Sequence, residues 1–221
     1  STLMRSSAAS DVYKRQIISG APNAWLDLEH IKASFVIGVD RGALTLVEHG
    51  ICPDIAIGDF DSVTESEFAK IKDSALELVQ LPSEKDETDT EVALNVAMTK
   101  EATDVRIYGS LGGRIDHSLA NIRLLLQFAK KGLPITLVDE RNHLMVLASG
   151  QHEINHPGLP YISFFALEST VTNLTLNRLK YPLTNYELTQ DDIRCISNET
   201  TESSFFVSFD SGYLLMIFSR D

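Results

Sequence analysis

Carboxylates cluster around short apolar runs in the first 90 residues. Asp40, Asp59 and Asp61 come directly after such runs. Asp86 and Asp89 lie in the segment Lys-Asp-Glu-Thr-Asp, where a segment of helical period begins. Carboxylate oxygens are hard ligands that suit Mg²⁺, and a magnesium ion can join an acidic protein to an anionic phosphate. The spacing therefore indicates chemistry on a phosphorylated substrate.

Each acidic residue has a simpler interpretation when it is taken singly. Asp89 would be favoured at a helix N-terminus, which carries a partial positive charge. That interpretation fails for four or five carboxylates at one edge, because like charges crowded together need a cation.

A glycine-rich segment supplies a second candidate phosphate site. Residues 109–116 read Gly-Ser-Leu-Gly-Gly-Arg-Ile-Asp, between a predicted strand and a predicted helix. Gly112 and Gly113 would let backbone N–H groups approach phosphate, and Arg114 offers a planar fork of donors. The segment is not a Walker loop, since Gly-Lys-Ser/Thr is absent. A tight turn alone would explain many such segments, and Asp116 also fits as the N-cap of the following helix.

Residues 17–142 have a sequence pattern that predicts a sheet, and such a sheet could bring the carboxylates and the glycine-rich segment to one of its edges. Short apolar runs alternate with segments of helical period, which is typical of an open, mostly parallel α/β sheet. Thr64 and Thr88 each precede a glutamate by three residues and predict helix starts, and a third helix is expected from about His117. Ligands of such sheets bind outside the carboxyl ends of the strands. The predicted strands cover residues 17–18, 35–39, 55–57, 105–108 and 135–138.

The pattern changes in residues 143–221, where helical periodicity is absent. We predict a small antiparallel β domain, sandwich or barrel, with turns such as Asp-Ser-Gly at 210–212. We interpret residues 1–16 as a non-native or disordered leader. The predicted strands of the β domain cover residues 161–165, 171–176, 204–209 and 213–218.

Composition narrows the class of partner. The formal net charge is −12 and the sequence pI is about 4.9, so nucleic acid and anionic membrane surfaces are excluded as expected partners. No apolar run approaches the roughly 20 residues needed to span a bilayer. Cys52 and Cys195 form neither a disulfide framework nor a metal-binding pattern, which favours a cytoplasmic location.

Six segments resemble, in order and spacing, those of the thiamin pyrophosphokinase family. The resemblance extends from about residue 17 to the C-terminus. The sequence departs from the family at Ser-Gly-Ala-Pro (19–22), where a double glycine usually precedes the proline, and at Arg41, where relatives often carry glycine. The matching segments are residues 40–42, 58–62, 86–89, 109–117, 177–183 and 197–199.

The resemblance implies an ATP-dependent, Mg²⁺-dependent enzyme that transfers diphosphate to the hydroxyl of thiamin and releases AMP. It also implies a homodimer with the active site at the subunit interface. Asp59, Asp61 and Asp89 match metal ligands of the family, and Ser197 and Asn198 match residues that contact the thiamin pyrimidine. The predicted ATP-binding residues are Asp40, Lys85, Thr88, Gly112, Gly113, Arg114 and Asp116.

Three questions stay open from the sequence. Asp86 and Asp61 are both candidates for the base that accepts the thiamin hydroxyl proton. A phosphatase of the haloacid dehalogenase type would use Asp59 as a nucleophile, although that motif belongs on a first strand and no later Gly-Asp-x-x-x-Asp is present. A non-enzymatic thiamin or nucleotide sensor is the other alternative, although binding alone does not need so many carboxylates.

Overall fold

The structure is a computed structural model, and it describes residues 14–21, 24–32, 34–112 and 114–221. The chain divides into two compact units, of which the first ends at Asn121 and the second begins at Ile122. The domain boundary after residue 142, where the sequence pattern changes from α/β to β-rich, stays a prediction.

The first unit contains a sheet of parallel strands, as the sequence predicted. Val and Ile dominate its inner strands, and both faces of these strands are covered, which is typical of parallel sheets. Within the described part of this unit the strands are, in spatial order, β5 (Asp104–Tyr108), β1 (Lys14–Ile18), β2 (Phe35–Val39), β3 (Ile55–Gly58) and β4 (Glu77–Gln80).

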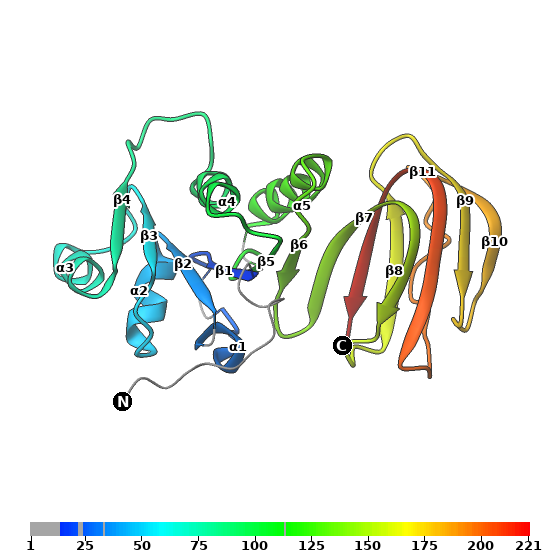
Figure 1. Ribbon diagram of the computed structural model, residues 1–221, viewed down its shortest axis with the longest axis horizontal. Coiled ribbons are helices and arrows are strands. Elements are labelled where there is room, and N and C mark those ends of the chain that lie inside the picture. The colour runs from blue at the N-terminus through cyan, green and yellow to red at the C-terminus, as the bar shows by residue number, and fades with distance from the viewer. Residues whose placement is uncertain (1–13, 22–23, 33, 113) are drawn as a thin grey trace. The chain divides into compact units, whose positions relative to one another are not determined.

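Helices cover the two faces of this sheet, with α4 on one side and α1 and α2 on the other (Figure 1). The capping box at Thr64 is confirmed: its hydroxyl accepts from the backbone N–H of Glu67, and the Glu67 carboxylate accepts from the backbone N–H of Thr64. Thr88 likewise accepts from the backbone N–H of Glu91 at the start of α4. The helices are α1 (Leu28–Lys32), α2 (Arg41–Glu48), α3 (Glu65–Ser74) and α4 (Asp89–Thr99).

The strand order reverses direction between β1 and β5. The chain runs outward from β1 through β2 and β3 to β4, and then returns by way of α4 to β5 on the other side of β1. Such a switch point opens a crevice at the carboxyl ends of the strands, where ligands of α/β sheets bind. The fold therefore predicts a ligand site beside the segments that follow β1 and β5.

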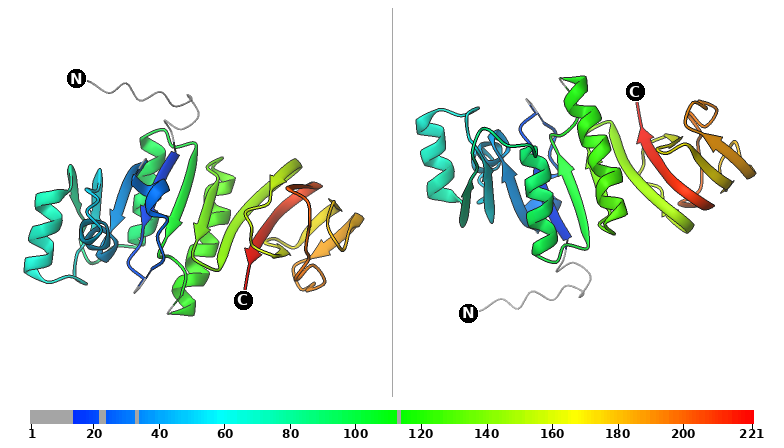
Figure 2. Two further views of the ribbon diagram at one scale, coloured as in Figure 1. Left: turned by 90° about the horizontal axis from the view of Figure 1, so that it is seen from below. Right: turned by 90° about the horizontal axis from the view of Figure 1, so that it is seen from above.

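The second unit is antiparallel, which confirms the predicted fold class. The central strand β11 pairs with β7, β8 and β9, while β10 pairs with β9 and β6 with β7. Figure 2 shows β7 and β11 side by side as long strands. The division between the units falls within α5 (Ile115–Lys130). The strands are β6 (Ile135–Val138), β7 (Asn142–Asn155), β8 (Tyr161–Ala166), β9 (Thr170–Asn177), β10 (Leu183–Thr189) and β11 (Ser204–Ser219).

The described structure differs from the sequence prediction in three main respects. Lys14, Arg15 and Gln16, which were assigned to the leader, belong to β1, while residues 1–13 lie outside the described part. The predicted strands at 204–209 and 213–218 form the single strand β11, with a register shift between Phe209 and Tyr213. Strands β4, β7 and β10 were not predicted at all.

Within the described residues, no helix combines the length and the apolar character that crossing a membrane requires.

Candidate active site

Three carboxylates gather at the carboxyl ends of β2 and β3 and at the start of α4. Asp40 precedes α2, and its Oδ1 accepts from the backbone N–H of Phe60 at 3.3 Å. Burial, the neighbouring Asp89 carboxylate and, to a smaller extent, the charge of Asp59 together raise the pKa of Asp40 to about 7. The structure therefore brings together Asp40, Asp59 and Asp89, as the sequence predicted from their strand-end positions.

The backbone at Asp40 is held in an uncommon conformation. Its φ is 47° and its ψ is −122°, a region that side chains other than glycine rarely adopt. Such strain costs about 1–3 kcal/mol and is concentrated at functional sites. The backbone conformation and the crowding by other carboxylates both lower the stability of the folded protein. Stability alone therefore does not explain why an aspartate occupies this position.

Lys85 contributes a positive charge to this cluster. Its Nζ lies 2.9 Å from Asp89 Oδ1, and it also donates to the backbone carbonyl of Pro82 at 3.2 Å. The contact with Asp89 raises the pKa of Lys85, and the charges of Asp59 and Asp40 raise it further. Lys85, which the sequence predicted to bind ATP, is therefore paired with the Asp89 carboxylate in this structure.

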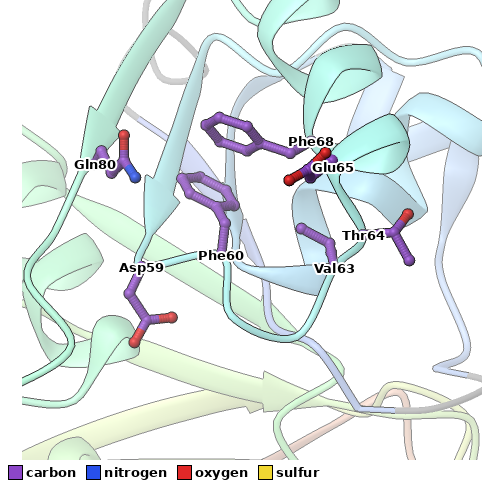
Figure 3. Close-up of a pocket in the computed structure, with 7 residues that line it drawn as sticks. All are labelled: Asp59, Phe60, Val63, Thr64, Glu65, Phe68 and Gln80. Atoms are coloured by element: carbon purple, nitrogen blue, oxygen red, sulfur yellow. The ribbon is translucent and has the colours of Figure 1, made fainter.

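Asp59 and Asp61 share a tight loop after β3. The backbone N–H of Asp61 donates to Asp59 Oδ1 at 3.0 Å, whereas the Asp61 side chain is exposed. Asp59 also borders a pocket of about 170 Å³, where the rings of Phe60 and Phe68 lie 5.0 Å apart. Figure 3 shows the Asp59 carboxylate turned away from these rings. The apolar side of the pocket and the acidic cluster are thus neighbours.

The predicted metal ligands do not form an assembled site. Among the described residues, no three Asp, Glu, His or Cys side chains are arranged to hold a metal ion. The chemistry of the donors fits Mg²⁺, because hard carboxylate oxygens crowd together at this place. The arrangement does not, because Asp89 is paired with Lys85 and Asp61 points to solvent. The assignment of Asp59, Asp61 and Asp89 to a metal stays a prediction.

Asp40 should make the stability of the metal-free protein depend on pH. Its pKa in the folded protein is about 7, above the ordinary value of 3.8, so the folded state binds this proton more tightly than the unfolded state. The associated stability is complete below about pH 4 and is lost as the pH rises through about 7. We expect urea titrations in EDTA to show a free energy of unfolding that declines from pH 5 to pH 8. The decline should be smaller in Asp40→Asn, and identical profiles for the two proteins would contradict the assignment.

The segments that follow β1 and β5 are joined at the switch point. The backbone N–H of Ser19 donates to the Tyr108 carbonyl at 2.8 Å, and that of Ala21 donates to the Gly109 carbonyl at 3.1 Å. Ser19 Oγ lies 3.2 Å from the hydroxyl of Thr90, which follows Asp89 in α4. The sequence analysis selected neither Ser19 nor Thr90, because a lone hydroxyl residue gives no signal until the fold shows its neighbour.

The glycine-rich segment is only partly described. Gly112 has a φ of 97°, which favours glycine, and Gly113 lies outside the described residues. Arg114 forms a bidentate contact with Asp116, with Nε–Oδ1 at 3.1 Å and Nη2–Oδ2 at 2.5 Å. Asp116 is the second residue of α5, so it is not the N-cap that the sequence suggested. Both side chains are exposed, so the fork of Arg114 can exchange Asp116 for another anion.

The remaining candidates of the first unit lie on the segment before α4. Asp86 is exposed, so it stays a candidate for the general base together with Asp61. The Thr88 hydroxyl oxygen caps α4 by accepting from the backbone N–H of Glu91, which leaves its proton free to donate to a phosphate oxygen.

In the second unit, Ser197 and Asn198 have different surroundings. Ser197 is exposed, with a φ of 57°, and its backbone N–H donates to Ser163 Oγ at 3.1 Å. Asn198 is buried, and its amide is bonded to the backbone of Tyr181 in both directions: Oδ1 accepts from the N–H at 2.9 Å and Nδ2 donates to the carbonyl at 2.8 Å. Asn198 therefore positions the segment around Tyr181, and of the two residues it is Ser197 whose side chain is accessible.

A second pocket, of about 480 Å³, opens beside these residues. Lys180 Nζ pairs with Glu199 Oε1 at 2.8 Å, and the backbone N–H of Lys180 donates to the Glu199 carbonyl at 2.7 Å. The pocket is lined by Arg178, Leu179, Lys180, Glu199, Thr200, Thr201 and Glu202.

Comparison with known proteins gives a consistent result. Residues 27–137 match the family model for the thiamin pyrophosphokinase catalytic domain, and residues 151–214 match that for its vitamin B1 binding domain. The chain is 42% identical to thiamine pyrophosphokinase of Bacillus subtilis over 186 residues. These aligned residues cover 84% of this chain and 87% of the relative. It is also 25% identical over 177 residues to thiamin pyrophosphokinase 1 of Caenorhabditis elegans, covering 75% and 70% of the two chains.

Solved structures agree with these matches. A crystal structure of thiamine pyrophosphokinase from Bacillus subtilis superimposes with a TM-score of 0.88 at 39% identity, covering 94% of this chain and 99% of the other. A structure from Geobacillus thermodenitrificans gives a TM-score of 0.85 at 38% identity, with coverage of 94% and 98%.

Proposed function

This chain belongs to the thiamin pyrophosphokinase family, and we propose that its acidic strand ends bind ATP for the transfer of diphosphate to the hydroxyl of thiamin, with release of AMP. The observation in the structure that supports this location is the gathering of Asp40, Asp59 and Asp89 at the carboxyl ends of β2 and β3 and the start of α4. An acidic protein that binds a polyphosphate needs cations at this point. Neither the phosphatase nor the sensor considered from the sequence is supported by the comparisons.

The chain supplies several groups that would hold and orient the phosphates. Arg114 would present its planar fork, and Lys85 and the Thr88 hydroxyl would donate to further oxygens. Asp59, Asp61 and Asp89 would hold Mg²⁺, whose chemistry is to neutralise charge on the phosphate groups being transferred. Transfer of phosphoryl groups demands mainly such positioning and charge stabilisation.

Thiamin would be bound by the second unit. Ser197 is the exposed polar group that we expect to contact the aminopyrimidine, and Asn198 would act by holding the Tyr181 segment in place. We further propose a homodimer with the active site at the subunit interface, and a cytoplasmic location.

The proposed function is tested by identifying the products of the reaction. Purified protein mixed with ATP, Mg²⁺ and thiamin should release AMP and thiamin diphosphate in equal amounts, which chromatography would measure. Release of inorganic phosphate with an aspartyl-phosphate trapped on Asp59 would instead indicate the phosphatase. Binding of both ligands without any product would indicate the sensor.

Arg114→Lys should raise the KM for ATP by about tenfold and leave the KM for thiamin nearly unchanged. An ammonium cannot form the two parallel hydrogen bonds of a guanidinium, and tenfold corresponds to about 1.4 kcal/mol. Steady-state kinetics with each substrate varied would measure both constants. Arg123→Lys, at an exposed arginine of α5, is the matched control. Superimposable ATP curves for the wild type and Arg114→Lys would show that Arg114 does not touch the nucleotide.

A further inference from the structure

Lys85 is unusually buried for a lysine. Its side chain is 13% exposed, whereas lysines are almost never buried unless they are paired. The ammonium has two partners, Asp89 Oδ1 at 2.9 Å and the carbonyl of Pro82 at 3.2 Å. The ion pair links a residue of the β4–α4 segment to the first residue of α4.

The ammonium faces a larger negative charge than that of one carboxylate. Asp40 and Asp59 also act on Lys85, and Asp40 is close enough to Asp89 for their carboxyl groups to interact. A positive charge at this place offsets the repulsion among three acidic groups. Asp89 Oδ1 is one of the two oxygens that this carboxylate could offer to a metal ion.

We propose that Lys85 is a resident counter-ion of the acidic cluster, which holds Asp89 while no metal is bound and must leave it before Asp89 can coordinate one. The proposal rests on the proposed function in one respect, namely that Asp89 is a metal ligand. An ammonium and a divalent cation repel each other at contact distance, so each weakens the binding of the other to one carboxylate.

The position of Lys85 allows such a movement. It lies before α4, in a segment without regular secondary structure, so its side chain can turn away without breaking a helix. Once it is released, the ammonium becomes available to an anionic oxygen of the nucleotide. Lys85 would therefore pair with the carboxylates before a metal binds and with a phosphate oxygen afterwards.

The test is direct binding of Mn²⁺ to the protein without nucleotide or thiamin, measured by calorimetry. We expect Lys85→Met to bind Mn²⁺ at least about tenfold more tightly than the wild type, because a competing charge is removed. Lys85→Arg, which keeps the charge, should bind as weakly as the wild type. Lys72→Met, at an exposed lysine of α3, makes the same change in net charge and should have no effect.

A second readout is thermal stability in EDTA. Lys85→Met should melt at a lower temperature than the wild type and Lys72→Met, because its carboxylates have lost their cation, and Mn²⁺ should restore the loss. Lys85→Gln, which keeps a donor for the Pro82 carbonyl, replaces Lys85→Met in both measurements if the latter does not fold.

The outcomes separate this proposal from the proposed function. Equal Mn²⁺ affinity in the wild type and Lys85→Met, with binding lost in Asp89→Asn, would overturn the role of Lys85 and keep the metal site. Weaker binding or no binding in Lys85→Met would also overturn it. A protein that shows the expected Mn²⁺ behaviour and yet releases no AMP would contradict the proposed function alone.

Discussion

Asp59→Asn is expected to lower the rate of AMP release by about 10²–10³-fold while the protein keeps its fold. Removing one principal electrostatic group from an active site typically has a cost of this size. Asparagine retains an oxygen at the position of Oδ1, so the hydrogen bond from the backbone N–H of Asp61 can persist and the loop should be preserved. Turnover at saturating ATP, Mg²⁺ and thiamin would measure the loss.

Two further variants make this result specific. Asp73→Asn removes the same charge from an exposed position of α3 and should leave turnover unchanged. Asp61→Asn should match Asp59→Asn if Asp61 turns inward to bind the metal, as the family resemblance implies. Near-normal turnover in Asp59→Asn would remove Asp59 from the metal site.

Strands with continuous apolar runs could be predicted from the sequence with accurate bounds. Both β2 (Phe35–Val39) and β6 (Ile135–Val138) are where the runs placed them. Strand β4 (Glu77–Gln80) was missed because it has polar ends and is only partly buried. Its sequence, Glu-Leu-Val-Gln, has no apolar run, and the strand forms because β3 offers a free edge to pair with. The free edge is a property of the sheet, so it cannot be seen in the sequence of the segment itself.

The single strand β11 shows a different limit. Asp-Ser-Gly at 210–212 has the composition of a turn, and Gly212 has a φ of 93°. The structure places a register shift there within a continuous strand, which pairs with β9 up to Ser211 and with β8 from Leu214 onward. The turn-forming residues lie where the strand changes from one partner to the other, and the sequence carries no sign of those partners.

Some residues of the candidate site could be predicted from local sequence, whereas the contacts between them could not. The acidic residues could be predicted because each follows a strand or begins a helix, which is local information. The pairing of Asn198 with Tyr181 could not, since the two residues are joined only by the fold of the second unit. Nor could the capture of Asp89 by Lys85 be predicted, because a spacing of four residues implies contact only inside a helix, and Lys85 lies outside one.

Gly58→Ala is expected to lower turnover by about 10²-fold, through displacement of the Asp40 carboxylate. A Cβ at residue 58 would overlap Asp40 Oδ1 and lie 2.7 Å from Asp40 Cγ, and the φ of 156° also favours glycine. The side chain of Asp40 would have to rotate out of the cluster, because it is the flexible partner in this contact. The loss should then resemble that of Asp40→Gly, which removes the carboxylate directly and accepts the φ of 47° at residue 40.

A double-mutant cycle distinguishes this route from a general loss of structure. Residues that act through one another give effects that do not add, so Asp40→Gly/Gly58→Ala should be no less active than Asp40→Gly alone. Gly50→Ala measures the cost of a side chain at a positive φ without a clash, since φ there is 70° and no atom lies within 4 Å of the added Cβ. It should lower the melting temperature and leave turnover unchanged. If the losses of Gly58→Ala and Asp40→Gly multiply in the double variant, the glycine serves the backbone of β3, and the close approach of its Cα to Asp40 has no part in positioning the carboxylate.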